Sequence, residues 1–156
     1  MSHDRTEREP RHVEVLPPDE LAARVAKAMY ARDRAVQDLA IEIEHVGPGN
    51  ARLSMRIKRE MLNGHDTCHG GYIFTLADSA FAYACNSYNH TTVAAGCAIE
   101  YVAPAREGDL LTAVAEERAL AGRTGTYDIT VTNQDRGTVA LFRGRSYRIK
   151  GNVIRD

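Results

Sequence analysis

One carboxylate within an apolar segment is the first candidate for chemistry. Asp78 is the only acidic residue between Tyr72 and Cys85. A charge in such surroundings loses hydration, so it is usually paired, hydrogen-bonded or used. A carboxylate of this kind can act as the general base that activates a water molecule. A structural Asp, bonded to Ser79 or to a neighbouring backbone amide, is the alternative.

Two glycines are the second candidate. Gly70 and Gly71 follow His69 and begin a predicted helix that runs to about Asn86. Helix N-termini carry unpaired N–H groups and a partial positive charge, and glycine lets a ligand oxygen approach them. Such an end can polarise a carbonyl and hold an oxyanion. A loop that only needs the backbone freedom of glycine is the alternative.

The spacing of the two candidates predicts an oligomer. Eight residues separate Gly70 from Asp78, which is about 12 Å along a helix axis. Both cannot reach one carbonyl carbon within a single chain. A two-fold homodimer with antiparallel helices brings Gly70 of one subunit towards Asp78 of the other. If both residues act together, the site spans two subunits.

The loop before the glycines is rich in polar residues. His65, Asp66, Cys68 and His69 lie within five positions, but no second pair of His or Cys ligands follows at a recognised spacing. We therefore predict no metal site, and assign Asn63 and His69 to a pocket where they orient the loop or contact substrate. Cys68 beside His69 is an alternative nucleophile, although no thiol-enzyme motif surrounds it.

The elements that must position these residues follow from the hydrophobic pattern. Pro17-Pro18-Asp19 predicts a helix start with Asp19 as N-cap, and Asp33 is predicted to cap a short second helix running to Asp38. From Leu39 the apolar residues alternate, which predicts a strand and then a hairpin at 47–50. Further strands are expected at 93–102, 110–120, 124–132 and 138–149.

The 71–86 helix is apolar on several sides, so it should be enclosed. We therefore predict an α+β fold in which five to six antiparallel strands wrap around one long central helix. Gly144 within the last strand indicates a bulge or a close backbone approach. Arg143 and Arg145 are expected on one strand face, and a phosphate-bearing ligand or plain solvent could occupy it.

Composition narrows the function classes. The chain has 156 residues and a net charge of −1, which fits one domain and disfavours nucleic acid as a partner. We expect a flexible tail at 1–17, one domain at 18–150 and a C-terminal tail at 151–156. Three cysteines without a CxxC pair indicate reduced thiols. The polar N-terminus and the lack of a long apolar run predict a cytoplasmic protein without membrane contact.

The run NGHDTCHGGYIFTLADSAFAYACNS resembles the PaaI-type phenylacetate-pathway thioesterases, within the hotdog-fold acyl-CoA thioesterases. So do AIEYVAPAREGDLLTA, GRTGTYDITVTNQ and TVALFRGRSYRI. The similarity extends from about residue 28 to 150. The HGG followed eight residues later by the Asp of LAD is fairly specific for the wider family, and the longer string for the PaaI-type branch.

The resemblance implies the hotdog fold, dimers that usually pair into homotetramers, and hydrolysis of acyl-CoA. Asp78 would activate water or attack the thioester directly, and the Gly70 N–H would hold the carbonyl oxygen. Asn63 and His69 would help to place water and thioester. No cofactor is expected, because coenzyme A belongs to the substrate.

For the substrate we expect phenylacetyl-CoA or its ring-hydroxylated relatives. Gly71, Phe74 and Tyr83 are predicted to bind it, and Arg123 or Arg145 to meet its phosphates. Phe81 and Tyr88 are further candidates for the acyl pocket, although core packing explains Phe74 and Phe81 equally well.

One departure concerns the strand facing Asp78. Related thioesterases often carry Ser or Thr there, where this chain reads Val93-Ala94-Ala95-Gly96-Cys97; Thr91 or Thr92 is a possible substitute. Three rival interpretations remain: a hotdog hydratase, which lacks its His or Glu here; a non-catalytic acyl-CoA binder; and a thioesterase of broader acyl specificity.

Overall fold

The structure, a computed structural model, describes residues 15–155. The predicted N-terminal tail at 1–17 thus lies mostly outside the described residues. The elements in chain order are α1 (Pro18–Tyr30), α2 (Arg34–Asp38), β1 (Glu42–Gly47), β2 (Asn50–Arg56), a 3-10 turn (Arg59–Met61), α3 (Gly70–Asn86), β3 (His90–Tyr101), β4 (Leu110–Ala121), β5 (Thr124–Thr132) and β6 (Thr138–Asn152).

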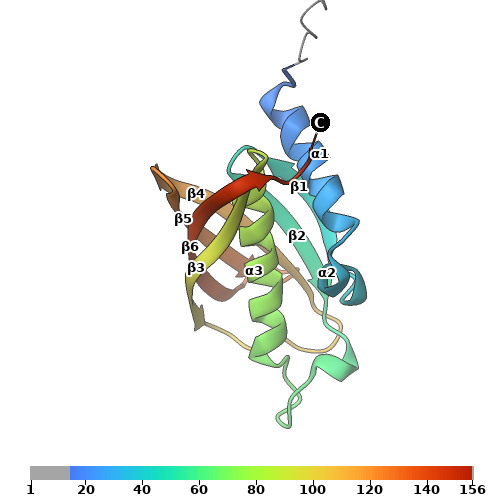
Figure 1. Cartoon of the computed structure of the whole chain (residues 1–156). Helices are drawn as coiled ribbons and strands as arrows, with labels where there is room; N and C mark the ends of the chain where they lie inside the picture. Colours follow the sequence, from blue (N-terminus) through green and yellow to red (C-terminus); the bar gives the residue numbers. More distant parts are fainter. Residues whose placement is uncertain (1–14, 156) are drawn as a thin grey trace, which may run out of the picture.

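The six strands form one antiparallel sheet in the order β1-β2-β4-β5-β6-β3. The sheet curves around the long helix α3, while α1 and α2 lie beside β1 and β2 (Figure 1). This confirms the predicted α+β architecture with one central helix. Strands β1 and β3 are the two edges, so within the described part of the chain each pairs on one side only.

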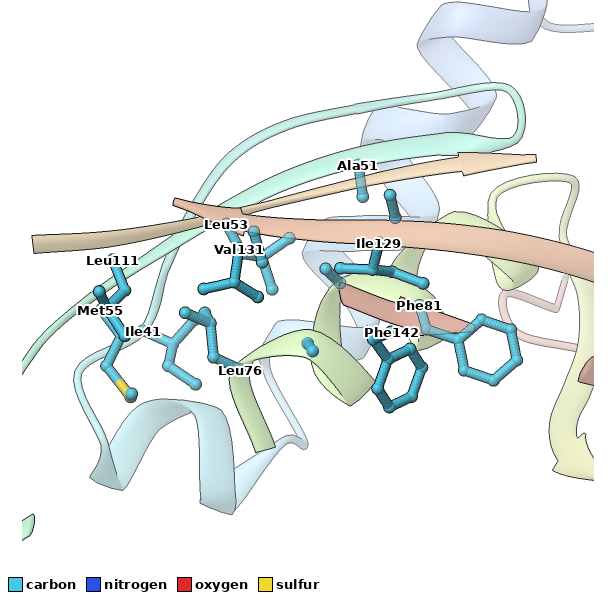
Figure 2. Close-up of a cluster of buried hydrophobic side chains, with 14 of the residues drawn as sticks. Ile41, Ala51, Leu53, Met55, Leu76, Phe81, Leu111, Ile129, Val131 and Phe142 are labelled. Carbon is cyan, nitrogen blue, oxygen red and sulfur yellow. The ribbon is translucent and has the colours of Figure 1, made fainter. Parts of the chain in front are cut away.

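The core lies between α3 and the concave face of the sheet. Leu76, Ala77 and Ala80 are fully buried on the helix, and small alanine side chains let the strands approach closely. Phe81 continues this face and packs on Phe142 and Tyr127. Figure 2 shows Leu76, Phe81 and Phe142 in one cluster with aliphatic residues from β2, β4 and β5. Burial of this surface holds α3 in a fixed place relative to the sheet.

Gly144 is the point where β6 passes closest to α3. A Cβ on Gly144 would lie 2.7 Å from Cε1 of Phe81, which is closer than side-chain carbons normally come. The close approach predicted for this glycine is confirmed. Because Gly144 faces α3, its neighbours Arg143 and Arg145 face outward, on one side of the strand as predicted.

Some predicted boundaries were wrong. Pro17, rather than Asp19, is the N-cap of α1, and Asp19 lies in the first turn, where it favours the helix dipole. Strand β1 begins at Glu42 instead of Leu39, because Leu39 closes α2 and Ala40 turns the chain at a φ of 51°. Asp33 does cap α2, since its Oδ1 accepts from the Val36 amide.

The C-terminal strand runs further than expected. Strand β6 continues to Asn152, and the Ile154 amide donates to Oδ1 of Asn89 at 2.8 Å. Among the described residues, no helix is both long and apolar enough to cross a membrane.

Candidate active site

The first turn of α3 offers one free backbone donor. His69 is the N-cap, and its Nδ1 accepts from the Gly71 amide at 3.0 Å. The Tyr72 amide donates to the carbonyl of His69. Within residues 15–155 the Gly70 amide has no acceptor. The donor that sequence reasoning assigned to an oxyanion is thus the one that the fold leaves available.

This cap also selects the tautomer of the neutral His69 side chain. Because Nδ1 accepts a hydrogen bond, the neutral imidazole carries its proton on Nε2, which is free to donate outward. The Gly71 amide, in contrast, is occupied by His69. Gly71 therefore has no backbone N–H to offer a substrate, and its predicted binding role is limited to close approach.

Asn63 organises the loop that leads to the cap. Its Oδ1 accepts from the amides of His65 at 2.9 Å and Thr67 at 3.3 Å, and its Nδ2 donates to Oγ1 of Thr67. The His69 amide then donates to the carbonyl of Met61. Of the two roles predicted for Asn63, these bonds favour orienting the loop.

Asp78 is half-buried on α3, on the side facing β3. Burial raises the pKa of its carboxyl group, and a contact with the Cys97 thiol acts in the opposite direction. Sγ of Cys97 lies 3.8 Å from Oδ1. Of the structural alternatives, the bond from Ser79 is absent, because the Ser79 hydroxyl donates to the carbonyl of Thr75 at 2.6 Å. Among the described residues no backbone amide donates to the carboxylate either, and Cys97 is its one hydrogen-bond partner. The carboxylate is available as a base.

Cys97 is a site residue that sequence reasoning missed. The register between β3 and β6 shifts between Ala94 and Gly96, so that Ala95 is an extra residue in β3. Since strand faces alternate, this bulge reverses the face that Cys97 would otherwise take relative to the start of the strand. Cys97 pairs with Gly144, whose face meets α3. No sequence signal marked the bulge.

The threonines suggested for this place lie elsewhere. The Thr92 hydroxyl donates to the carbonyl of His90, and its backbone pairs with the side chain of Asn86. Thr91 lies beside Gly151 near the end of β6. The donor beside Asp78 is therefore a thiol.

Comparison with known proteins agrees with this geometry. Residues 65–140 match the sequence profile of the thioesterase superfamily. The acyl-coenzyme A thioesterase PaaI of Escherichia coli K12 is 48% identical over 128 residues, covering 82% of this chain and 91% of that protein. The solved structure of E. coli PaaI, a protein of the phenylacetic acid degradation operon, has a TM-score of 0.86 at 46% identity, over 87% of this chain and 99% of that one.

The chain belongs to the PaaI-type branch of the thioesterase superfamily. It is a thioester hydrolase with the hotdog fold, as the sequence resemblance implied. A more distant member, a hypothetical thioesterase of Streptococcus pneumoniae TIGR4 solved with coenzyme A, has 25% identity and a TM-score of 0.69, over 72% of this chain and 90% of that one.

The aromatic residues of this thioesterase divide into two groups. Phe74 is half-buried one turn before Asp78, with its ring 5.3 Å from that of Phe142. Tyr83 is fully buried, and its hydroxyl donates to Asp33 at 3.4 Å. Tyr83 therefore has no surface to offer a substrate, and the prediction that it binds one is corrected. In the sequence, a tyrosine on an apolar helix looks the same whether it is buried in the core or faces a substrate.

The remaining aromatic candidates are structural as well. Phe81 belongs to the core under Gly144. The Tyr88 hydroxyl donates to Oε2 of Glu117 at 2.9 Å, and burial together with that carboxylate raises the pKa of Tyr88 to about 12.

The two predicted phosphate contacts, Arg145 and Arg123, are placed differently relative to Asp78. Arg145 is exposed on the outer face of the sheet, with its guanidinium over Gly96, whereas Asp78 is on the inner side. Arg123 lies in the β4–β5 turn, beside a small hollow of about 60 Å³ that Tyr88 and His90 also line. It is therefore near the C-terminal end of α3.

The hollow nearest to the free amide has a volume of about 370 Å³. His69, Gly71, Tyr72 and Thr75 line one side of it, and α2 lines the other. A larger hollow of about 640 Å³ lies between α1 and β1, but it contains none of the predicted site residues. Among the described residues, no group of three His, Cys, Asp or Glu side chains could hold a metal ion.

Proposed function

We propose that this thioesterase hydrolyses phenylacetyl-CoA and ring-hydroxylated relatives to the free acid and coenzyme A. The observation that carries the proposal is one helix with an unpaired Gly70 amide at its start and a carboxylate of raised pKa, Asp78, two turns later. The names of its relatives support the substrate class: the E. coli protein is an acyl-coenzyme A thioesterase from a phenylacetic acid degradation operon.

In the proposed reaction the thioester oxygen accepts a hydrogen bond from the Gly70 amide. Asp78 takes a proton from water as the water oxygen attacks the carbonyl carbon. The resulting oxyanion is held at the helix N-terminus, where the partial positive charge favours it. The intermediate then expels the thiolate of coenzyme A, which receives the proton from Asp78. Direct attack by Asp78 would instead form an anhydride that water cleaves.

A homodimer completes this site, because Gly70 and Asp78 lie about 12 Å apart on one helix. Strand β3 supports such a dimer. Its outer edge has no partner strand among residues 15–155, and its middle carries small exposed residues, from Ala94 to Ala98. Two β3 edges that pair about a two-fold axis would run antiparallel and place the two α3 helices antiparallel as well. Pairing of two such dimers into a tetramer is part of the proposal.

The remaining residues take supporting roles. Nε2–H of His69 can donate to water or substrate, and Asn63 holds the loop that positions it. Phe74, next to Asp78 on the helix surface, is the proposed aromatic wall of the acyl pocket. Arg123 is the proposed phosphate contact, provided by the subunit whose Asp78 serves the site. The proposal requires no metal or redox cofactor.

The test is release of free thiol from a panel of acyl-CoAs by the wild type and Asp78→Asn. We expect preference for aryl-acetyl groups and a loss of at least about a hundredfold in kcat for the variant. Asp135→Asn, an exposed turn residue with no side-chain bond among the described residues, is the matched control and should retain full activity. Full activity in Asp78→Asn would overturn the mechanism; equal turnover of aliphatic substrates would establish the broader specificity instead.

A further inference from the structure

The peptide unit between Gly70 and Gly71 is held from both sides by side chains. Its N–H, on Gly71, donates to Nδ1 of His69 at 3.0 Å. Its carbonyl, on Gly70, accepts from the hydroxyl of Tyr101 at 2.9 Å. A carbonyl oxygen has two lone pairs, so it can accept this bond together with its bond within the helix.

Tyr101 also contacts Gly70 through its ring. A Cβ on Gly70 would lie 2.9 Å from Cζ and 3.2 Å from Cε1 of that ring, so only glycine fits here without displacement. Tyr101 itself is anchored: it is the last residue of β3, pairs with Ala140 of β6, and is followed by Val102, whose amide donates to Val139. A rigid strand thus presents the tyrosine to the start of the helix.

The hydrogen bond from the Tyr101 hydroxyl to the Gly70 carbonyl adds little to the free energy of unfolding. Tyr101 is 52% exposed, so water competes for its hydroxyl and the net contribution of the bond to folding stability is small. Its local effect is larger, because two successive glycines have the widest choice of backbone angles. An oxyanion donor lowers the barrier only when it is already in place, and small displacements are expensive in rate.

We propose that Tyr101 is a positioning residue of the thioesterase reaction: by holding the carbonyl of Gly70 it limits rotation of the Gly70 backbone, and so helps to keep the Gly70 N–H, on the preceding peptide unit, in place. This inference rests on the proposed role of Gly70 as oxyanion donor. Tyr101 acts through Gly70 and does not need to touch the substrate. The ring and the hydroxyl of Tyr101 have separate roles. The ring leaves no room for a side chain at position 70, and the hydroxyl orients the peptide unit between Gly70 and Gly71.

The test compares Tyr101→Phe with Tyr147→Phe. Both substitutions remove one hydroxyl from a half-exposed strand tyrosine, and Tyr147 has no side-chain hydrogen bond among the described residues. For Tyr101→Phe we expect kcat to fall about threefold to tenfold, the equivalent of one net hydrogen bond, with KM and the melting temperature unchanged. Tyr147→Phe should match the wild type in all three quantities.

A second measurement is independent of activity. Selective 15N labelling of the twelve glycines allows amide exchange to be followed at Gly71. In Tyr101→Phe this amide should exchange several times faster than in the wild type, while the strand glycine amides of Gly96, Gly125 and Gly144 keep their rates. The result holds even for a protein that hydrolyses no thioester, so a failure of the proposed function is distinguished from a failure of this inference.

Two results would overturn the inference. One is unchanged kcat together with unchanged exchange at Gly71 in Tyr101→Phe. The other is an equal loss of kcat in both tyrosine variants, which would reflect a general effect of removing strand hydroxyls.

Discussion

The thiol of Cys97 on β3 lies 3.8 Å from Oδ1 of Asp78 on α3, and no other side chain of the described residues bonds that carboxylate. Burial disfavours the ionised form of Asp78, whereas the thiol stabilises it. Burial and, after it, the Asp78 carboxylate raise the pKa of Cys97, so the thiol keeps its proton and stays a donor. Strand β3 thus tunes the proposed base from across the helix–sheet boundary.

Replacement of this thiol should shift the pH dependence of catalysis. Asp78 acts as a base only when ionised, so kcat/KM rises with pH through its pKa. Cys97→Ala removes a contact that lowers this pKa, and the acid limb of the profile should move to higher pH. Cys97→Ser offers a stronger donor and should return the limb to the wild-type position or below. Identical limbs in all three proteins would refute the role of Cys97.

Asp78 should also reduce the stability of the fold that it serves. Its folded-state pKa is raised by burial, so ionisation above the ordinary aspartate pKa disfavours the native state. Asp78→Asn should therefore be more stable at pH 7, on the order of 0.5 kcal/mol given solvent screening of a half-exposed group. The gain should vanish below the pKa of an unfolded aspartate. Thermal unfolding at pH 7 and at a pH below that pKa, with Asp135→Asn as control, measures this gain in stability. If Asp78→Asn were less stable than the wild type at pH 7, the raised pKa of Asp78 would be contradicted.

Gly144→Ala should destabilise the core. The new Cβ would meet the Phe81 ring at 2.7 Å, and overpacking of this kind costs about 1–3 kcal/mol. Gly64→Ala is the matched control, because nothing lies within 4 Å of its Cβ position. Denaturant unfolding of the two variants should show the loss for position 144 alone. Equal stability would mean that β6 can move away from α3.

How far the sequence predicts such details depends on the range of the interactions. The α3 helix, Asp33 as a cap and the close approach at Gly144 follow from local periodicity and glycine placement. The contact between Cys97 and Asp78 depends on a bulge that only strand pairing reveals. The prediction that Tyr83 binds substrate was wrong, because the sequence of an apolar helix does not show whether an aromatic residue faces a pocket or the core.

The oxyanion donor can be removed by one substitution at Gly70. Gly70 is the first residue of α3, where proline is well tolerated and its missing N–H breaks no helical bond. Gly70→Pro should lower kcat by about a hundredfold or more relative to Gly70→Ala, which has the same Cβ clash with Tyr101 but keeps the N–H. Steady-state kinetics of the pair give the comparison, and equal rates would exclude the Gly70 amide from catalysis.

Complementation between two inactive variants tests the shared site most directly. Asp78→Asn and Gly70→Pro are unfolded together, mixed in equal amounts and refolded, so that subunits pair at random. If Gly70 of one subunit works with Asp78 of the other, each mixed dimer has one intact site, and the mixture should recover about a quarter of wild-type activity. If each site lies within one chain, every site contains a defect. A mixture as inactive as its two components, with mixed dimers shown to be present, would contradict the account.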